Sequence, residues 1–111
     1  MYDLKNTTNF MNSDSYKERF IAEYWQVKIR YEKLKAFNNK IEASERMHYG
    51  SRKRVEVPTH DCSSELLRQQ QSVMGEYLHI LEVRAVIEDI NLNYNILTFE
   101  ESSCIGTTKS N

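Results

Sequence analysis

Residues 63 to 90 form one uninterrupted helical pattern that carries two apolar stripes instead of one. Each stripe repeats at alternating spacings of three and four residues, which places its members on one helix face. A helix in a chain of 111 residues can bury one stripe against a single companion helix, so we expect the second to contact another subunit. The first stripe contains Leu67, Met74, Leu78, Leu81 and Ala85, and the second contains Leu66, Val73, Tyr77, Ile80 and Ile87.

The second stripe also contains two polar residues, Gln70 and Arg84. An amide and a guanidinium in an apolar seam are costly unless they find a partner. Two interpretations stay open. The two residues either form a polar layer that fixes the register of a helical bundle, or they bind a ligand where subunits meet.

A second helix is predicted from residue 15 to about residue 44. Ser15 and Glu18 have the spacing of a capping box, in which each side chain accepts a hydrogen bond from the other's backbone N–H. The apolar positions that follow have the spacing of a coiled-coil seam, broken only by Asn38. They are Phe20, Tyr24, Val27, Tyr31, Leu34 and Ile41. Because residues 63 to 89 match this helix in length, we expect an all-α fold, an antiparallel two-helix hairpin that assembles into a helical oligomer.

The chain divides into three parts on this interpretation. They are a flexible N-terminal arm at residues 1–13, a helical-hairpin domain at residues 14–90 and a C-terminal tail at residues 91–111. The arm is polar, although its Tyr2, Leu4 and Phe10 could dock on a neighbour. Gly50 and Pro58 interrupt the helical pattern between the two helices, and the tail contains one strand-like run at residues 94–99.

Composition and charge limit the location and the partners. The formal net charge of -1 provides no global field toward nucleic acid or an anionic membrane. No apolar run approaches the roughly 18 residues of a membrane span, and the first residues do not have the pattern of an export signal. Cys62 and Cys104 are therefore expected to be free thiols in a reducing cytoplasm.

Catalytic and metal sites are not expected. His60, Asp61 and Cys62 are the residue types of a nucleophilic triad, but adjacent side chains point in different directions. His48, His60 and Cys62 lack the paired short spacings of a zinc site. We therefore expect no enzyme activity, no metal and no cofactor.

Cations beside aromatic residues provide a different kind of site, because a cation meets a phosphate while a ring stacks on a base. Arg52 to Arg54 with Tyr49 form one such group in the connection, and the alternative is a solvated loop. The first helix has a larger group, for which the alternatives are core packing and i,i+4 ion pairs. It contains Lys17, Arg19, Lys28, Arg30 and Lys33 among Tyr16, Tyr24, Trp25 and Tyr31.

The two helical segments, YKERFIAEYWQVKIRYEKLKAF and ELLRQQQSVMGEYLHILEVRA, resemble the helical-hairpin sponge proteins of bacteriophages. That group includes the anti-CBASS sponge and the hairpin portion of the anti-Thoeris sponge. The matching positions are Tyr16 to Arg19, Glu23, Arg30, Lys33, Leu34, Phe37, Leu67, Gln70, Met74, Tyr77, Leu81 and Arg84.

The resemblance implies a phage counter-defence protein in the host cell cytoplasm that sequesters cyclic oligonucleotide signals without degrading them. It further implies a homo-oligomer, often a hexamer, with pockets where hairpins meet. By position, Tyr16, Lys17, Arg19, Arg30 and Lys33 would bind cyclic dinucleotides, and Gln70, Tyr77 and Arg84 would bind cyclic trinucleotides. Two other functions stay open: an adaptor that docks its second stripe on a host protein, and a nucleic-acid binder that uses Arg52 to Arg54.

Overall fold

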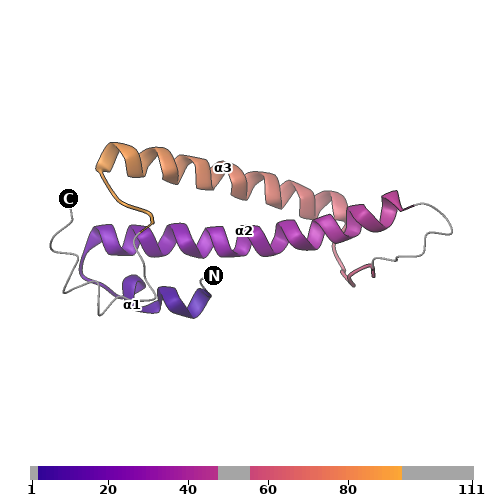
Figure 1. Ribbon diagram of the computed structural model, residues 1–111, viewed down its shortest axis with the longest axis horizontal. Helices are drawn as coiled ribbons and strands as arrows, with labels where there is room; N and C mark the ends of the chain where they lie inside the picture. The colour runs from indigo at the N-terminus through magenta and orange to yellow at the C-terminus, as the bar shows by residue number, and fades with distance from the viewer. Residues whose placement is uncertain (1–2, 48–55, 94–111) are drawn as a thin grey trace.

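The computed structural model describes residues 3–47 and 56–93. In that part of the chain every regular element is helical, which confirms the predicted all-α class. The elements are η1 (Leu4–Thr7), α1 (Thr8–Met11), α2 (Tyr16–Arg46) and α3 (Ser64–Glu88). Helices α2 and α3 lie side by side, and η1 and α1 pack beside the first half of α2 (Figure 1). The molecule is elongated, with extents of 58 × 25 × 22 Å.

Several sequence features lie outside the described residues. They are Tyr2, His48, Tyr49, Gly50, Arg52 to Arg54, the strand-like run at 94–99 and Cys104. None of the described helices is long and apolar enough to cross a membrane.

Both long helices begin at serine caps, close to the predicted positions. The Ser15 hydroxyl accepts from the Glu18 amide at 3.4 Å, and the Ser63 hydroxyl accepts from the Leu66 amide at 3.1 Å. The Glu18 carboxylate accepts from the Ser13 hydroxyl instead of completing the expected capping box. Helix α3 ends at Asp89, whose φ of 58° is in the left-handed region that stops a helix.

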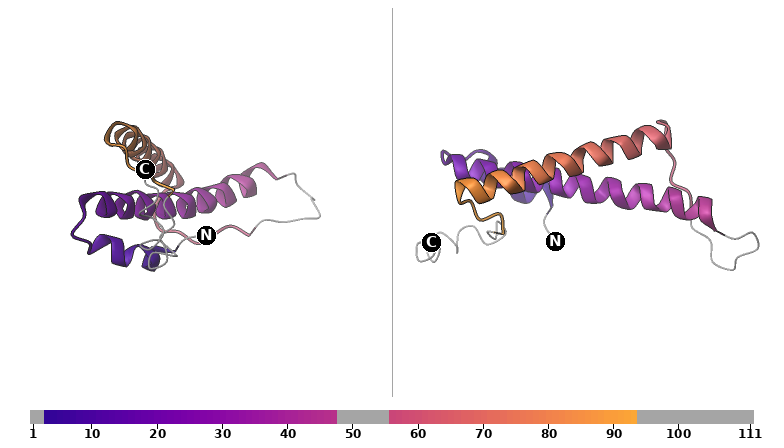
Figure 2. Two further views of the ribbon diagram at one scale, coloured as in Figure 1. Left: turned by 60° about the vertical axis from the view of Figure 1, so that its left-hand side comes forward. Right: turned by 90° about the horizontal axis from the view of Figure 1, so that it is seen from above.

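The inner stripe of α3 packs on α2 and forms the core. Leu78, Leu81 and Ala85 are buried against Phe20 and Tyr24 of α2. Hydrogen bonds join Tyr16 to Glu88, Tyr24 to Glu82 and Asn38 to Gln71, so residue numbers fall along α3 as they rise along α2. The two helices are therefore antiparallel, as the views in Figure 2 also show.

The aliphatic side chains of the second stripe of α3 are exposed in the part of the chain that the structure describes. Leu66 and Ile80 are each 54% exposed, Val73 is 57% exposed and Ile87 is 77% exposed. Val83 and Val86 are exposed beside them. We call this face, with its two polar residues Gln70 and Arg84, the α3 outer seam. The structure confirms that one helix face of this chain packs internally while the other stays uncovered.

The prediction of a flexible N-terminal arm is wrong for residues 4–11. These residues form η1 and α1, and Phe10, only 1% exposed, enters the core with Phe20 and Ile21. The Gln26 amide donates to the buried Thr7 hydroxyl at 3.1 Å, which ties η1 to α2. The buried Phe10 ring and the Thr7 hydrogen bond thus hold this segment against α2.

The C-terminal end of α3 is also fixed to α2. Ile90 is buried in the core, and its amide donates to the Ala85 carbonyl at 2.8 Å. The Trp25 indole donates to the Leu92 carbonyl at 2.8 Å. The chain therefore turns back over α2 directly after α3.

Phe10→Ala should lower the free energy of unfolding by about 3 kcal/mol, because it removes a buried aromatic ring and leaves a cavity. Asn9→Ala, at an exposed position of the same short helix, should change it by less than about 0.5 kcal/mol. Urea unfolding followed by circular dichroism measures both. If both substitutions change the free energy of unfolding equally little, residues 4–11 form a loose arm and not part of the core.

Candidate functional site

Arg84 lies at the junction between the α3 outer seam and the first turns of α2. Its guanidinium is 4.9 Å from the centre of the Phe20 ring. Its Nη2 donates to the Tyr16 hydroxyl at 2.7 Å, and its Nε donates to Glu88 Oε2 at 3.3 Å. The Tyr16 hydroxyl donates to Glu88 Oε1 at 2.8 Å. We call these four residues the Arg84 cluster.

The Arg84 cluster has the groups that recognise an anion attached to a ring. A guanidinium presents planar donors that match a carboxylate or a phosphate, and it is attracted to the face of an aromatic ring. In this structure the Glu88 carboxylate pairs with the guanidinium. The hydrogen bond to that carboxylate raises the pKa of Tyr16, because ionisation would put two negative charges side by side.

Two more tyrosines bond to glutamates across the same pair of helices. The Tyr77 hydroxyl of α3 donates to the Glu23 carboxylate of α2, which raises the pKa of Tyr77. The Tyr24 hydroxyl donates to Glu82 Oε2 at 3.0 Å. Tyr77 therefore uses its hydroxyl within the chain, while the residue as a whole stays 40% exposed on the outer seam.

The remaining predicted ligand residues are solvent-exposed. Arg19 Nη1 donates to the Ser13 carbonyl at 2.8 Å, so this guanidinium holds the turn before α2. The side chains of Lys17, Arg30 and Gln70 make no hydrogen bond or ion pair with any described residue. Lys33 differs from them, because it lines a groove.

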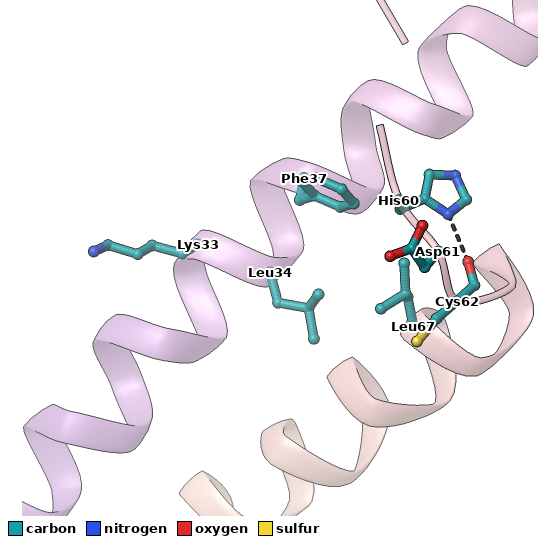
Figure 3. A pocket seen from close by; sticks show the side chains of 7 residues that line it. All are labelled: Lys33, Leu34, Phe37, His60, Asp61, Cys62 and Leu67. Carbon is teal, nitrogen blue, oxygen red and sulfur yellow. Dashed lines mark hydrogen bonds between the residues drawn. The ribbon is translucent and has the colours of Figure 1, made fainter. Parts of the chain in front are cut away.

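The groove lies between α2 and the segment that leads into α3, and its volume is about 500 Å³. We call it the Phe37 groove. It is lined by Lys33, Leu34 and Phe37 of α2, by His60, Asp61 and Cys62, and by Leu67 of α3 (Figure 3). This volume falls within the range of small-ligand sites in proteins, roughly 300–1,000 Å³.

The structure groups the predicted residues differently from the sequence. The resemblance placed Tyr16 with Lys33 in one site and Arg84 in another. In the fold, Tyr16 bonds to Arg84, from which it is 68 residues away in the chain. Lys33 lies 17 residues further along α2, which corresponds to about 25 Å of helix. The hairpin thus has two candidate sites, one near each end of α3.

Among the described contacts, His60 meets the backbone of Cys62 and not its thiol. His60 Nδ1 lies 2.5 Å from the Cys62 backbone oxygen, and the ring packs edge-on to Phe37 at 6.0 Å. Among residues 3–47 and 56–93, no group of three or more His, Cys, Asp and Glu side chains could hold a metal ion. Sequence reasoning had not grouped Phe37 with His60 and Asp61, and no local spacing links them.

The Tyr24 contact makes the hairpin sensitive to alkaline pH. Burial, together with the hydrogen bond to Glu82, raises the pKa of Tyr24 from 10.0 to about 12. The unfolded chain therefore loses this proton first, so the stability contribution is complete below pH 10 and is lost between about pH 10 and pH 12.

Tyr24→Phe should flatten this part of the stability curve, as measured by thermal melting from pH 9 to 12, and Glu82→Gln should reduce its slope. Identical slopes in all three proteins would contradict the assignment.

Comparison with known proteins adds one finding. No curated protein and no solved structure matches this chain. A family model described as Sequestin matches residues 14–87, about two thirds of the chain, and this span contains Tyr16, Phe20 and Arg84 as well as the whole Phe37 groove. The name of the family points to a sequestering role. Because the match covers most of the described hairpin, the chain belongs to the Sequestin family.

Proposed function

We propose that this protein binds cyclic di- or trinucleotide signals of bacterial antiviral defence on behalf of a phage, and releases them unchanged. Membership of the Sequestin family supports the sequestering role. The resemblance to phage anti-CBASS and anti-Thoeris sponges supports the ligand class and the host cytoplasm as the place of action. No cofactor is needed, because the function requires affinity and no turnover.

The observation that carries this proposal is the Arg84 cluster. A guanidinium is held over the Phe20 ring, bonded to Tyr16, and placed at an uncovered apolar face. A nucleotide supplies the matching groups, since its phosphate replaces the Glu88 carboxylate and its base packs on exposed apolar and aromatic side chains. A purely structural ion pair would not need the uncovered apolar surroundings.

The α3 outer seam supports self-assembly, which we propose to be hexameric. The seam runs at alternating spacings of four and three residues from Leu66 to Ile87, with Gln70 and Arg84 as its polar positions. A second copy that covers this seam would enclose the Arg84 cluster and remove water from it. Charge-assisted contacts to a ligand strengthen when water is excluded. The ligand site would thus be completed by assembly.

A host-protein adaptor is the competing function, and the uncovered seam is the observation that favours it. An adaptor keeps the seam exposed until its partner arrives, so the isolated protein would be a monomer. The sequestering function buries the seam between copies of this chain.

Heat release tests the function directly. The purified protein, mixed with a panel of cyclic di- and trinucleotides, should deplete at least one of them from solution. After heat denaturation and removal of the protein, the same nucleotide should be recovered chemically intact, as measured by mass spectrometry. An altered nucleotide would indicate an enzyme. No depletion before heating would reject both functions.

Arg84→Ala in the same assay tests the Arg84 cluster. The change removes a charged hydrogen-bond donor, and we expect nucleotide affinity to fall roughly tenfold or more. Arg68→Ala removes the same side chain from an exposed position of the same helix and should leave affinity unchanged. Equal affinities of both variants and the parent would remove Arg84 from the site.

Ile80→Glu tests the assembly. Ile80 is 54% exposed in the middle of the outer seam, and a carboxylate there would be buried without a partner in any oligomer that covers the seam. We expect this variant to be a monomer by light scattering, while Ser72→Glu, at an exposed α3 position away from the seam, keeps the parent's oligomeric state. A monomeric parent protein would favour the adaptor.

A further inference from the structure

The Phe37 groove is separate from the Arg84 cluster, and the proposed function does not use it. It has the size of a small-ligand site, about 500 Å³, and it combines an apolar lining with a few polar groups. Figure 3 shows Leu34, Leu67 and the Cys62 sulfur pointing toward one another between the two helices, with Phe37 and His60 above them.

One wall of the groove is aromatic and fixed in place. The rings of Phe37 and His60 have centroids 6.0 Å apart and an interplanar angle of 79°. His60 is held in turn through Nδ1 at the Cys62 backbone oxygen. A ring whose orientation is held by a neighbour is a good stacking surface, because little side-chain entropy is lost when a second ring packs on it.

Two cationic residues precede Phe37 on the same face of α2. Arg30, Lys33 and Phe37 follow one another at spacings of three and four residues, so they share one face of the helix. Lys33 is exposed at the edge of the groove, and its side chain extends away from His60 and the other lining residues (Figure 3). No described carboxylate forms an ion pair with either cation. The face thus presents two free positive charges beside one aromatic ring.

Asp61 adds a hydrogen-bond acceptor beside the aromatic wall. Its carboxylate is exposed and lines the groove next to His60. Adenine, guanine and cytosine carry an exocyclic amino group that can donate to a carboxylate, whereas uracil does not. Uracil offers a carboxylate only its ring N3–H, so the acceptor favours the bases that carry an amino group.

We infer that the Phe37 groove binds one amino-bearing base of a nucleotide, stacked on Phe37. Asp61 accepts a hydrogen bond from the amino group of the base, and Lys33 with Arg30 binds the phosphate. The inference rests on the proposed function for the class of ligand, and it adds a second site on the same chain.

Cys62 provides a direct measurement of occupancy, because its exposed thiol lines the groove. Cys104→Ser leaves Cys62 as the only thiol in the chain. We expect a bound nucleotide to slow alkylation of this thiol by iodoacetamide, roughly tenfold at ten times the Kd. The probes are the same cyclic di- and trinucleotides used in the heat-release assay, with cyclic di-UMP as the member that lacks amino groups.

Matched substitutions separate the base contact from a general loss of structure. Phe37→Ala should weaken the nucleotide affinity measured from Cys62 protection roughly 5- to 160-fold, the range for loss of one stacked base. Asp61→Asn should reduce the preference for amino-bearing bases over cyclic di-UMP, while Asp14→Asn, an exposed carboxylate before α2, should not. Circular dichroism confirms that each variant keeps its helical content.

Three outcomes of the depletion and alkylation assays test this inference. A nucleotide that is depleted from solution and protects Cys62 in the parent, but not in Phe37→Ala, supports the groove as a base site. A nucleotide that is depleted without slowing the alkylation overturns this inference and leaves the proposed function standing. Protection that rises with protein concentration and not with nucleotide also overturns it, because a second copy then fills the groove.

Discussion

The packing of the inner stripe of α3 against α2 is the contact on which the other features of this molecule depend. Leu81 is 1% exposed and Ala85 is 3% exposed at this contact, and Phe20 and Tyr24 complete it from α2. Once this face of α3 is buried, the helix must present its second apolar face outward. Arg84 is carried to the edge of that face, where it reaches Phe20. The uncovered seam and the Arg84 cluster are therefore consequences of one packing choice.

Polar groups fix how far α3 may slide along α2. Apolar contacts alone would tolerate a shift by one helical turn, because the stripes repeat at each turn. Asn38, 4% exposed, donates to the Leu67 carbonyl at 3.2 Å and to the Gln71 side chain at 2.9 Å, and a shift would break both bonds in a buried place. The bonds of Tyr24 to Glu82 and Tyr77 to Glu23 act in the same direction. The register that they define places Tyr16 beside Arg84.

The two candidate sites differ in what surrounds them. The Arg84 cluster is flanked by exposed aliphatic side chains, and its own carboxylate, Glu88, already occupies the anion position. The Phe37 groove lies within one chain, and its cations Arg30 and Lys33 are not paired with any described carboxylate. An assembly that covers the outer seam would enclose the first site without using the groove. On the two proposals above, one small hairpin would hold chemically similar ligands in two different environments, one shared between subunits and one internal.

The sequence alone determined the two long helices, their serine caps and the two stripes of α3, because periodicity and capping depend on residues within a few positions of one another. It could not place Phe10, since a four-residue helix has no periodicity and is stable only through its contact with α2. The sequence also could not predict the hydrogen bond between Tyr16 and Arg84, or that Phe37, His60 and Asp61 line one groove. Those contacts are decided by the register of α3 on α2 and by the path of the chain entering α3, and only the tertiary structure determines both.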